Sequence, residues 1–340
     1  MSPEDVPQSP PQRTDSDAGA PDARCPFCGE TATAPWCQTC DEAGSDYCVR
    51  MCQACGTAFL WPAPSEAALT SAYASDYYGA GDTKFNPKVE RFRDCFSKFR
   101  ARNLTRGLVA GARILDVGCG DGRLLRTIQR VGQYELHGIE LPGRAAERAA
   151  GTPGIQLHLG TLKATQLSTS AFDLITLVHV YEHLPDPRDT LDRLANLVRP
   201  GGRLFLAFPN IASWQARAFR GNWFHLDPPR HLSLVPPSVV IAYLESKGCR
   251  LLNERHLCLE QNTYGWIQSI LNSCDLHRNF LYERLKRNRS YVPDRGPGTV
   301  AMHAAAAGFV LVPALFLDCA AAAAQAGATV ELTFERTTIT

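Results

Sequence analysis

Short apolar runs alternate with helical patterns from residue 113 to the end of the chain. The runs are rich in Val, Ile, Leu and Phe, and polar or glycine-containing segments separate them. This alternation is typical of an α/β protein whose largely parallel sheet is covered by helices on both faces. We predict strands at 113–118, 135–140, 155–159, 172–180 and 203–208, and two more at 250–258 and 328–336. The last two strands are separated by about 70 residues, too many for a hairpin loop, so a helical insert must precede the final strand.

Two helices are predicted before the first of these strands. One follows Pro62, with Ser65 as its N-cap, and ends near 76–79. The other covers about 87–108, where apolar residues recur among Arg and Lys. We interpret its basic face as solvated surface rather than a nucleic-acid site, because no aromatic platform accompanies it.

The predicted insert contains an apolar run at 304–317 that ends at Asp318. Fourteen apolar residues interrupted by Pro313 are too few to span a bilayer, so we predict no transmembrane segment. We expect buried helices that form a lid or a homodimer contact. The alternative is a membrane-surface or lipid-substrate patch that makes peripheral lipid contact.

The amino-acid composition indicates the class of protein but does not identify a binding partner. Hydrophobic residues make up 45% of the chain and charged residues 20%, as in soluble globular proteins. The chain has 35 Lys and Arg against 34 Asp and Glu, so its net charge is too small to attract nucleic acid electrostatically. We therefore expect no nucleic-acid partner. Residues 1–24 are nearly devoid of large apolar side chains, which predicts a disordered tail. They contain no basic start followed by an apolar stretch, so we expect no secretory signal and a cytoplasmic location.

Seven of the 13 cysteines fall between residues 25 and 55, and this clustering indicates a metal site rather than disulfides. Cys25 with Cys28, and Cys52 with Cys55, form two CxxCG pairs. Each pair can place two thiolates on one side of a tetrahedral ion. We predict that these four residues bind structural zinc in a ribbon over 25–60. A ribbon this short lacks a core of its own and needs the ion to fold.

Three further cysteines leave alternatives for this site. Cys37 and Cys40 form another pair between the two, and Cys48 is left over. One ion could use the first pair together with Cys37 and Cys40, or a second ion could use Cys48. The remaining alternative is a set of reduced cysteines without metal.

A glycine turn between the strand at 113–118 and the next helix indicates a nucleotide-like ligand. Gly118, Gly120 and Gly122 read GxGxG, one residue tighter than the dinucleotide fingerprint, and Asp116 precedes them on the strand. A carboxylate there disfavours a pyrophosphate and suits a cationic ligand. Glu140 ends the next strand, 20 residues after Gly120, where an α/β fold places an acid to bind ribose hydroxyls.

These residues resemble motif I and its downstream acid in class I S-adenosylmethionine (SAM) dependent methyltransferases. The resemblance covers nearly all of 25–340 and points to bacterial enzymes with an N-terminal zinc ribbon. Its motifs are CPFCG at 25–29, CQACGTAFLWPAPS at 52–65, DVGCGDG at 116–122, FDLITLVHVYEHLPDP at 172–187, RPGG at 199–202, DPPRHL at 227–232 and NTYGWIQS at 262–269. The implied fold is a Rossmann-like methyltransferase sheet.

The resemblance also implies a division of the chain and a set of cofactor contacts. The segments are a tail at 1–24, the ribbon at 25–60, a helical linker or cap at 61–108, the SAM-binding core at 109–260, the insert at 261–327 and the last strand at 328–340. The implied SAM-binding residues are Asp116, Gly118, Cys119, Gly120, Glu140, Thr161, Leu162, Val178 and His179. Many relatives carry an acid where this chain has Thr161.

Histidines near the expected cofactor mouth are candidates for proton transfer. Methyl transfer from a sulfonium is an in-line displacement, but a hydroxyl, phenol or amine acceptor needs a base to take its proton. We select His183 and His231 as acid/base candidates. The segment 179–183 also resembles a metal-binding GluxxGluHis motif of some methyltransferases, with His179 replacing its first Glu and His231 as a distant ligand. A third interpretation is structural, with Glu182 and His183 fixing the loop.

The resemblance therefore implies a SAM-dependent methyltransferase that acts on oxygen of a small molecule or glycosyl acceptor in a biosynthetic pathway. Three alternatives remain open. They are N- or C-methylation of a small molecule, methylation of RNA or protein with the ribbon as a docking module, and a noncatalytic SAM-fold scaffold.

Overall fold

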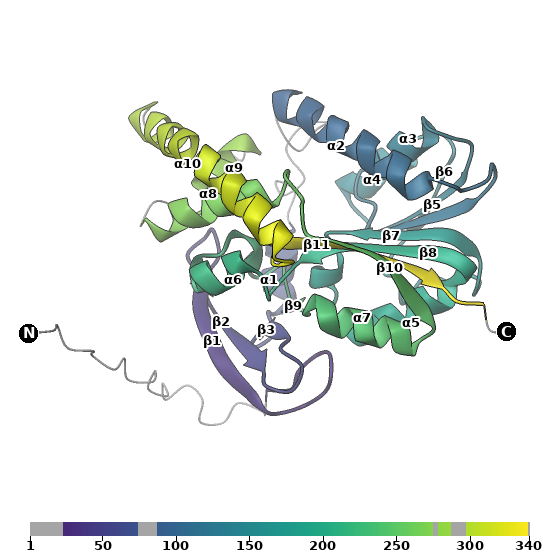
Figure 1. Cartoon of the computed structure of the whole chain (residues 1–340), viewed down its shortest axis with the longest axis horizontal. Coiled ribbons are helices and arrows are strands. Elements are labelled where there is room, and N and C mark those ends of the chain that lie inside the picture. Colours follow the sequence, from purple (N-terminus) through teal and green to yellow (C-terminus); the bar gives the residue numbers. More distant parts are fainter. Residues whose placement is uncertain (1–22, 74–86, 275–277, 287–296, 339–340) are drawn as a thin grey trace, which may run out of the picture.

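A computed structural model describes residues 23–73, 87–274, 278–286 and 297–338. The predicted tail, apart from its last two residues, and the helix end at 76–79 lie outside these ranges. The chain forms a large sheet covered by helices, a small sheet built by the N-terminal region and a helical insert beside both (Figure 1).

The large sheet has seven strands in the order β10-β11-β8-β7-β4-β5-β6. The strands are β4 (Arg113–Val117), β5 (Glu135–Glu140), β6 (Ile155–Leu159), β7 (Phe172–Val178), β8 (Val198–Pro209), β10 (Cys249–Arg255) and β11 (Thr329–Arg336). Strands β6, β5, β4, β7 and β8 run parallel, and β11 and β10 are antiparallel additions. The seven predicted strands are confirmed. β7 ends two residues early because His179 leaves the extended conformation, and β8 begins earlier than expected.

Helices cover both faces of the large sheet, as predicted (Figure 1). One face carries α2 (Pro87–Thr105), α3 (Arg123–Gln129) and α4 (Arg144–Ala150), and the other carries α5 (Pro187–Leu197) and α7 (Pro237–Ser246). Because the central strands are buried on both sides, most side chains of β4 and β7 are apolar. The predicted first helix is α1 (Glu66–Ala72), and the Ser65 hydroxyl accepts a hydrogen bond from Ala68 N as its cap.

The N-terminal region forms a second, antiparallel sheet in the order β1-β2-β3-β9. Its strands are β1 (Thr33–Cys40), β2 (Asp46–Cys52), β3 (Ala58–Leu60) and β9 (Ser233–Leu234). The fourth strand comes from far along the chain. Phe27 and Phe59 belong to the same apolar cluster as the central strands, and Phe27 packs edge-on against Tyr243 of α7. The ribbon is therefore built into the main core.

The insert contains α8 (Asn262–Ser273), α9 (Phe280–Leu285) and α10 (Pro297–Ala323). The apolar segment at 304–317 is part of a longer helix than expected, and contacts within this single chain do not bury it. The helix continues through Pro313 to a length of 27 residues, and much of its surface is exposed. By length and composition alone, its 26 residues Gly298–Ala323 are sufficient to cross a membrane, and it is the one such helix within the described ranges.

Short helical elements follow β7 and β8, and those after β8 contact the insert or the ribbon. They are α6 (Trp214–Phe219) and three 3₁₀ turns at Tyr181–His183, Arg220–Asn222 and Phe224–Leu226. At Gly221 the chain passes directly over β1, and a Cβ at this position would collide with the carbonyl oxygen of Gln38. The Thr39 hydroxyl donates to the Gly221 carbonyl oxygen over 2.8 Å, so the two backbones are held in contact.

We expect Gly221→Ala to lower the free energy of unfolding by about 1–3 kcal/mol, because the added methyl group must push two backbones apart. Denaturant unfolding followed by circular dichroism measures this loss. Gly308→Ala is the matched control, since nothing outside its own helix lies within 4 Å of the new Cβ, and it should be neutral or slightly stabilising. Equal stability of the two variants would contradict the close contact at Gly221.

Candidate active site

The glycine turn after β4 is shaped by close approach of neighbouring segments. Gly118, Gly120 and Gly122 all have positive φ, at 68°, 57° and 77°, a region that glycine enters without steric cost. A Cβ at Gly118 would lie 2.5 Å from a methyl group of Val180. The turn therefore brings the end of β4 against the loop that follows β7.

Most backbone amides of this turn are already used within the protein. Gly118 N and Cys119 N both donate to the Ile139 carbonyl oxygen, over 2.8 and 3.0 Å, and Gly120 N donates to Glu140 Oε2 over 2.6 Å. The Cys119 side chain is buried in the core, so this residue can offer a ligand only its backbone. A phosphate needs free amide donors, whereas this turn presents carboxylates. The geometry fits the predicted cationic ligand.

Asp116 lies buried at the carboxyl end of β4. Burial raises the pKa of its carboxyl to about 7, although a 2.6 Å hydrogen bond donated by the Thr176 hydroxyl opposes the shift. A buried carboxylate is stabilised by a cation, and the ammonium and sulfonium of SAM are such groups. The donor set at this turn is therefore compatible with SAM.

Glu140 ends β5 beside the turn, and its two oxygens accept from Gly120 N and Leu141 N. A carboxylate has about four acceptor positions, so capacity for ribose hydroxyls remains. Leu159 pairs with Glu140 in the sheet, which brings the exposed Thr161 to the same edge. Leu162 is buried in the main core. The two residues selected as adenine contacts thus lie near Glu140, and their role stays a prediction.

The loop after β7 carries the predicted pocket residues Val178 and His179. Val178 pairs with Ala207 of β8, and His179 N donates to the Ala207 carbonyl oxygen over 2.8 Å. His179 has a φ of 55°, a conformation that is uncommon and strained for a residue with a side chain. This bend directs the chain into the 3₁₀ turn that contains Glu182 and His183.

Glu182 is buried, and neither carboxylate oxygen has a hydrogen-bond partner. Its Oε1 lies 3.6 Å from His179 Nδ1 and 3.8 Å from His231 Nε2. Burial alone would raise the pKa of this carboxyl, but the imidazoles of His179, His231 and His183 offset it and hold the pKa at about 2. The carboxylate is charged at neutral pH and has histidines on several sides.

The structure brings the two predicted acid/base residues together, with ring centroids of His183 and His231 4.6 Å apart. His183 Nδ1 lies 2.9 Å from the Arg230 carbonyl oxygen, and His231 Nδ1 lies 2.8 Å from the His225 carbonyl oxygen. Carbonyl oxygens only accept, so each Nδ1 carries a hydrogen and each neutral ring keeps its Nε2 lone pair. Burial lowers the pKa of His183 to about 4.

Backbone hydrogen bonds hold the His231 segment between the ribbon and the β7 loop. Leu232 N donates to the Glu182 carbonyl oxygen over 2.9 Å, and Leu60 N of β3 donates to the Leu232 carbonyl oxygen over 3.1 Å. The next residues form β9 and complete the ribbon sheet. The ribbon therefore fixes the position of one predicted catalytic histidine.

Several residues of this region were not selected from the sequence. The Arg230 guanidinium pairs with Asp227 and, over 3.1 Å, with Glu42 in the β1–β2 hairpin. Burial would raise the pKa of Asp227, but this guanidinium holds it well below its usual range. The Tyr73 hydroxyl lies 3.0 Å from His183 Nδ1. These residues come together through tertiary contacts, which the local sequence does not reveal. Among them, only the residues of the motif at 227–232 could have been selected from the sequence.

His225 is a further buried histidine of this region. Burial lowers its pKa to about 3, and its Nε2 has no hydrogen-bond partner. Gly265 of α8 presses against this ring, since a Cβ there would lie 2.8 Å from His225 Nε2. The insert thus forms one wall beside the histidines.

The four cysteines selected as metal ligands converge at the base of the ribbon. Cys25 and Cys55 sulfurs are 3.6 Å apart, and those of Cys28 and Cys52 are 3.5 Å apart. Tetrahedral Zn–S bonds of about 2.3 Å would separate sulfurs by roughly 3.8 Å, close to these distances. The cluster is compatible with a structural zinc ion.

The alternative ligand sets do not assemble among the described residues, where the potential metal groups are this cluster and the set Glu182, His183 and His231. Cys37, Cys40 and Cys48 lie along the strands β1 and β2 instead.

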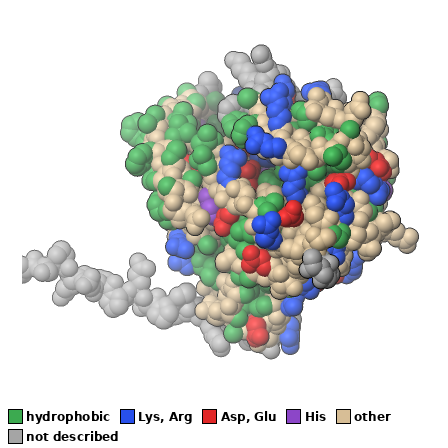
Figure 2. Space-filling view, turned by 45° about the vertical axis from the view of Figure 1, so that its right-hand side comes forward, with side chains coloured by type: hydrophobic (Ala, Val, Ile, Leu, Met, Phe, Trp, Pro, Cys, Tyr) green, Lys and Arg blue, Asp and Glu red, His purple; other side chains and the backbone are tan. Residues whose placement is uncertain are grey.

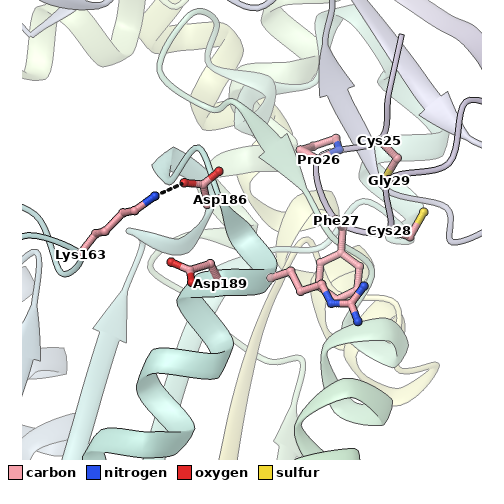
Figure 3. A pocket seen from close by; sticks show the side chains of 9 residues that line it. Cys25, Pro26, Phe27, Cys28, Gly29, Lys163, Asp186 and Asp189 are labelled. Carbon is pink, nitrogen blue, oxygen red and sulfur yellow. Dashed lines mark ion pairs between the residues drawn. The ribbon is translucent and has the colours of Figure 1, made fainter. Parts of the chain in front are cut away.

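A polar cavity of about 460 Å³ opens beside the cysteine cluster. The knuckle at 25–29 forms one wall, and Lys163, Asp186, Arg188 and Asp189 form the other. Figure 3 shows Lys163 and Asp186 pointing toward one another, with their charged groups 3.6 Å apart. None of the candidate histidines lines this cavity, so it is separate from the proposed methyl-transfer region.

Comparisons with known proteins agree with this geometry. A family model described as a methyltransferase domain matches residues 89–254. A ubiquinone biosynthesis O-methyltransferase of Albidiferax ferrireducens is 32% identical over 60% of this chain and 88% of its own. This chain belongs to the class I SAM-dependent methyltransferases. A second enzyme of the same name, from Paracidovorax citrulli, is 33% identical over 37% of this chain, which spans only 60% of that relative's length.

Among solved structures, this methyltransferase has a distant likeness to the [4+2]-cyclase SpnF. The TM-score is 0.49 at 17% identity, over 80% of this chain and 92% of that one. A likeness this remote says nothing about substrate. The family match, by contrast, begins within α2 and ends within β10, so it omits the ribbon and the insert.

We expect Cys52→Ser to lower bound zinc from about one ion per chain to nearly none and to lower the unfolding midpoint, because a ligand of the tetrahedral site is lost. Elemental analysis of the purified methyltransferase and thermal unfolding measure both effects. Cys40→Ser is the matched control and should retain the ion. Loss of zinc in the control alone would establish the alternative ligand set.

Proposed function

We propose that this methyltransferase transfers a methyl group from SAM to an oxygen of a small-molecule acceptor, such as a glycosyl compound, in a biosynthetic pathway. The observation that carries the proposal is the pair of buried acids, Asp116 and Glu140, at a glycine turn most of whose amides are occupied. The relatives named ubiquinone biosynthesis O-methyltransferases support oxygen as the acceptor atom.

When bound, SAM supplies an electrophilic methyl group, and an in-line approach of the acceptor is the main requirement for transfer. We assign Asp116 to the methionyl part of the cofactor and Glu140 to its ribose. Thr161 and Leu162 would contact the adenine, and the backbone of Gly118, Cys119 and Gly120 would line the methionyl side. Val178 and His179 would then lie beside the sulfonium.

An acceptor hydroxyl must lose its proton, and we assign this step to His231. Its Nε2 keeps a lone pair, because Nδ1 is bound to a carbonyl oxygen. The same Nε2 lies 3.8 Å from carboxylate oxygens of both Glu182 and Asp227, which would stabilise the imidazolium that forms. His183, with its pKa lowered to about 4, would stay neutral and accept a hydrogen bond from the acceptor.

A divalent metal is the second candidate for this cluster. Glu182, His183 and His231 each offer one possible ligand atom, and these three atoms all lie within 4.8 Å of one another. Both unpartnered oxygens of Glu182 would be satisfied by such an ion. Two imidazoles and one carboxylate favour a metal softer than magnesium.

SAM affinity should fall as the pH falls below about 7. The free enzyme must ionise Asp116, whose pKa is raised to about 7, whereas the bound cation favours the carboxylate. Below that pH, binding requires release of a proton, and the dissociation constant should rise about tenfold per pH unit. Calorimetric titration with SAM between pH 5.5 and 8 measures the slope.

The control for this titration lies on the same turn. Asp121→Asn should bind SAM with the wild-type pH dependence, since the Asp121 oxygen caps Arg123 N and an asparagine oxygen can do the same. Asp116→Asn should lose binding at every pH. A pH-independent affinity in the wild-type protein would refute the contact between Asp116 and the cation.

We expect His231→Ala to lower kcat about 10²–10⁴-fold, because a positioned base contributes that much to proton transfer. SAM affinity should be unchanged, and His183→Ala should have a smaller effect. Turnover is measured with a hydroxyl acceptor identified from a library screen. His137→Ala is a control, since this buried histidine lies in β5 and contacts Glu135 and His158 instead.

The two roles of the cluster differ in their response to chelation. If His231 acts as a base, activity survives dialysis against EDTA that leaves the cysteine-bound zinc in place. Activity that disappears and returns with an added divalent ion would assign the metal role. Wild-type turnover in both His183→Ala and His231→Ala would leave the cluster with a structural role alone.

A further inference from the structure

The outer face of α10 is apolar along its length. Its most exposed side chains are Phe309 at 87%, Phe316 at 74% and Val312 at 72%, and the other exposed large apolar residues are Met302, Leu311 and Leu315. No Asp, Glu, Lys or Arg occurs from residue 297 to 317. Figure 2 shows hydrophobic side chains gathered at the end of the molecule where α10 lies. A surface helix of a soluble protein normally carries polar side chains on this face.

The inner face of α10 is tied to the rest of the insert. Asp318, the single acid of the helix, is fully buried and accepts a 3.0 Å hydrogen bond from the Thr263 hydroxyl of α8. His303 is buried against the Phe280 ring of α9, with ring centroids 4.4 Å apart. Ala314 and Ala321 are also buried. The helix therefore lies along the protein and shows one side to its surroundings.

We propose that α10 is a membrane-docking surface that lies in the interface of a lipid bilayer, with Phe309, Val312 and Phe316 inserted among the acyl chains. Only 11% of its apolar window is buried within the protein, so most of that window needs an apolar environment from elsewhere. A helix of 26 residues is about 39 Å long, enough for an extended contact along the membrane plane. Crossing the bilayer would either break the contacts of α10 with Thr263 of α8 and Phe280 of α9 or carry these segments into the hydrocarbon, so the helix lies on the membrane instead.

A bilayer fits this face better than a second copy of the chain. Protein interfaces have an apolar centre with a polar rim, whereas the exposed side chains of α10 supply no charge at any point of the outer face. On a helical projection at 100° per residue, the exposed large side chains cover roughly half of the circumference. A half-cylinder of this kind suits immersion in acyl chains.

A residue type that favours membrane interfaces lies beside the C-terminal end of α10. Trp214 of α6 is 37% exposed, and its backbone N–H donates to the Ala326 carbonyl oxygen just beyond the helix over 3.1 Å. Arg217 follows one turn later and is exposed. A half-exposed Trp beside a basic residue is typical of the headgroup level, where the ring is amphipathic and the cation meets lipid phosphates. This end would mark the depth of insertion.

The test is flotation of the full chain with vesicles of phosphatidylcholine alone and of phosphatidylcholine with phosphatidylglycerol at 3:1. The wild-type protein should float with both, because the contact is chiefly apolar. Phe309→Ser with Phe316→Ser should weaken partitioning about 100-fold, roughly tenfold for each phenylalanine removed from the acyl chains. Both side chains are exposed, so the fold should not change.

Val109→Ser is the matched control, since Val109 is 71% exposed in the loop before β4 and far from the insert in sequence. Its vesicle binding should equal that of the wild type. SAM affinity and the unfolding midpoint, measured on all three proteins, separate loss of docking from loss of fold. Docking and methyl transfer are independent here, so a failure of either leaves the other standing.

Three results would overturn the proposal. The first is absence of flotation with both vesicles, and the second is flotation that the double substitution leaves unchanged. The third is binding that occurs only with phosphatidylglycerol and disappears in salt, which would indicate a charge contact. Sedimentation velocity without lipid tests for a dimer. If the wild-type protein is a dimer that dissociates in the double variant, and no vesicle binding is seen, the outer face of α10 binds a second copy of the chain.

Discussion

A carboxylate buried without hydrogen bonds is a costly group in a protein interior, and the candidate site is arranged around one. Glu182 keeps its charge because imidazoles surround it, and these come from separate parts of the chain. His179 and His183 belong to the loop after β7, whereas His231 arrives from the segment before β9. If any of these segments moved, the charge would lose its compensation. The site therefore constrains how the loop after β7 and the segment before β9 meet.

The ribbon and the insert take part in this arrangement through polar contacts. Glu42 of the ribbon hairpin contacts both Arg230 and the Asn279 amide of the insert, so a single partly buried acid joins three segments. Burial raises the pKa of Glu42, while the Arg230 guanidinium opposes the shift. The family match omits these parts. They are the regions in which this methyltransferase can differ from relatives that share its core.

The local sequence was sufficient to predict the helices and strands, but it was not sufficient to predict the tertiary contacts between them. The strands near Asp116 and Glu140 were predictable because a strand that is buried on both faces needs a nearly continuous apolar run. The metal ligands were predictable because two CxxC pairs have the spacing of a zinc site. β9 has two residues and exists only because β3 lies beside it, so no periodicity could predict it. The length of α10 was underestimated because Pro313 was read as an interruption, whereas alanine-rich flanks continue the helix. Its exposure is a tertiary property.

The sharing of β9 between the ribbon and the core has a consequence for how such a chain can evolve. An N-terminal module joined by a linker can be gained, lost or exchanged by recombination at the gene level. Here the last strand of the module is encoded more than 170 residues after the third, and Phe27 and Phe59 fill the core of the catalytic fold. A recombination breakpoint after the third strand would leave an unpaired sheet edge on one product and an open core on the other. Ribbon and catalytic fold must therefore be inherited as a single unit.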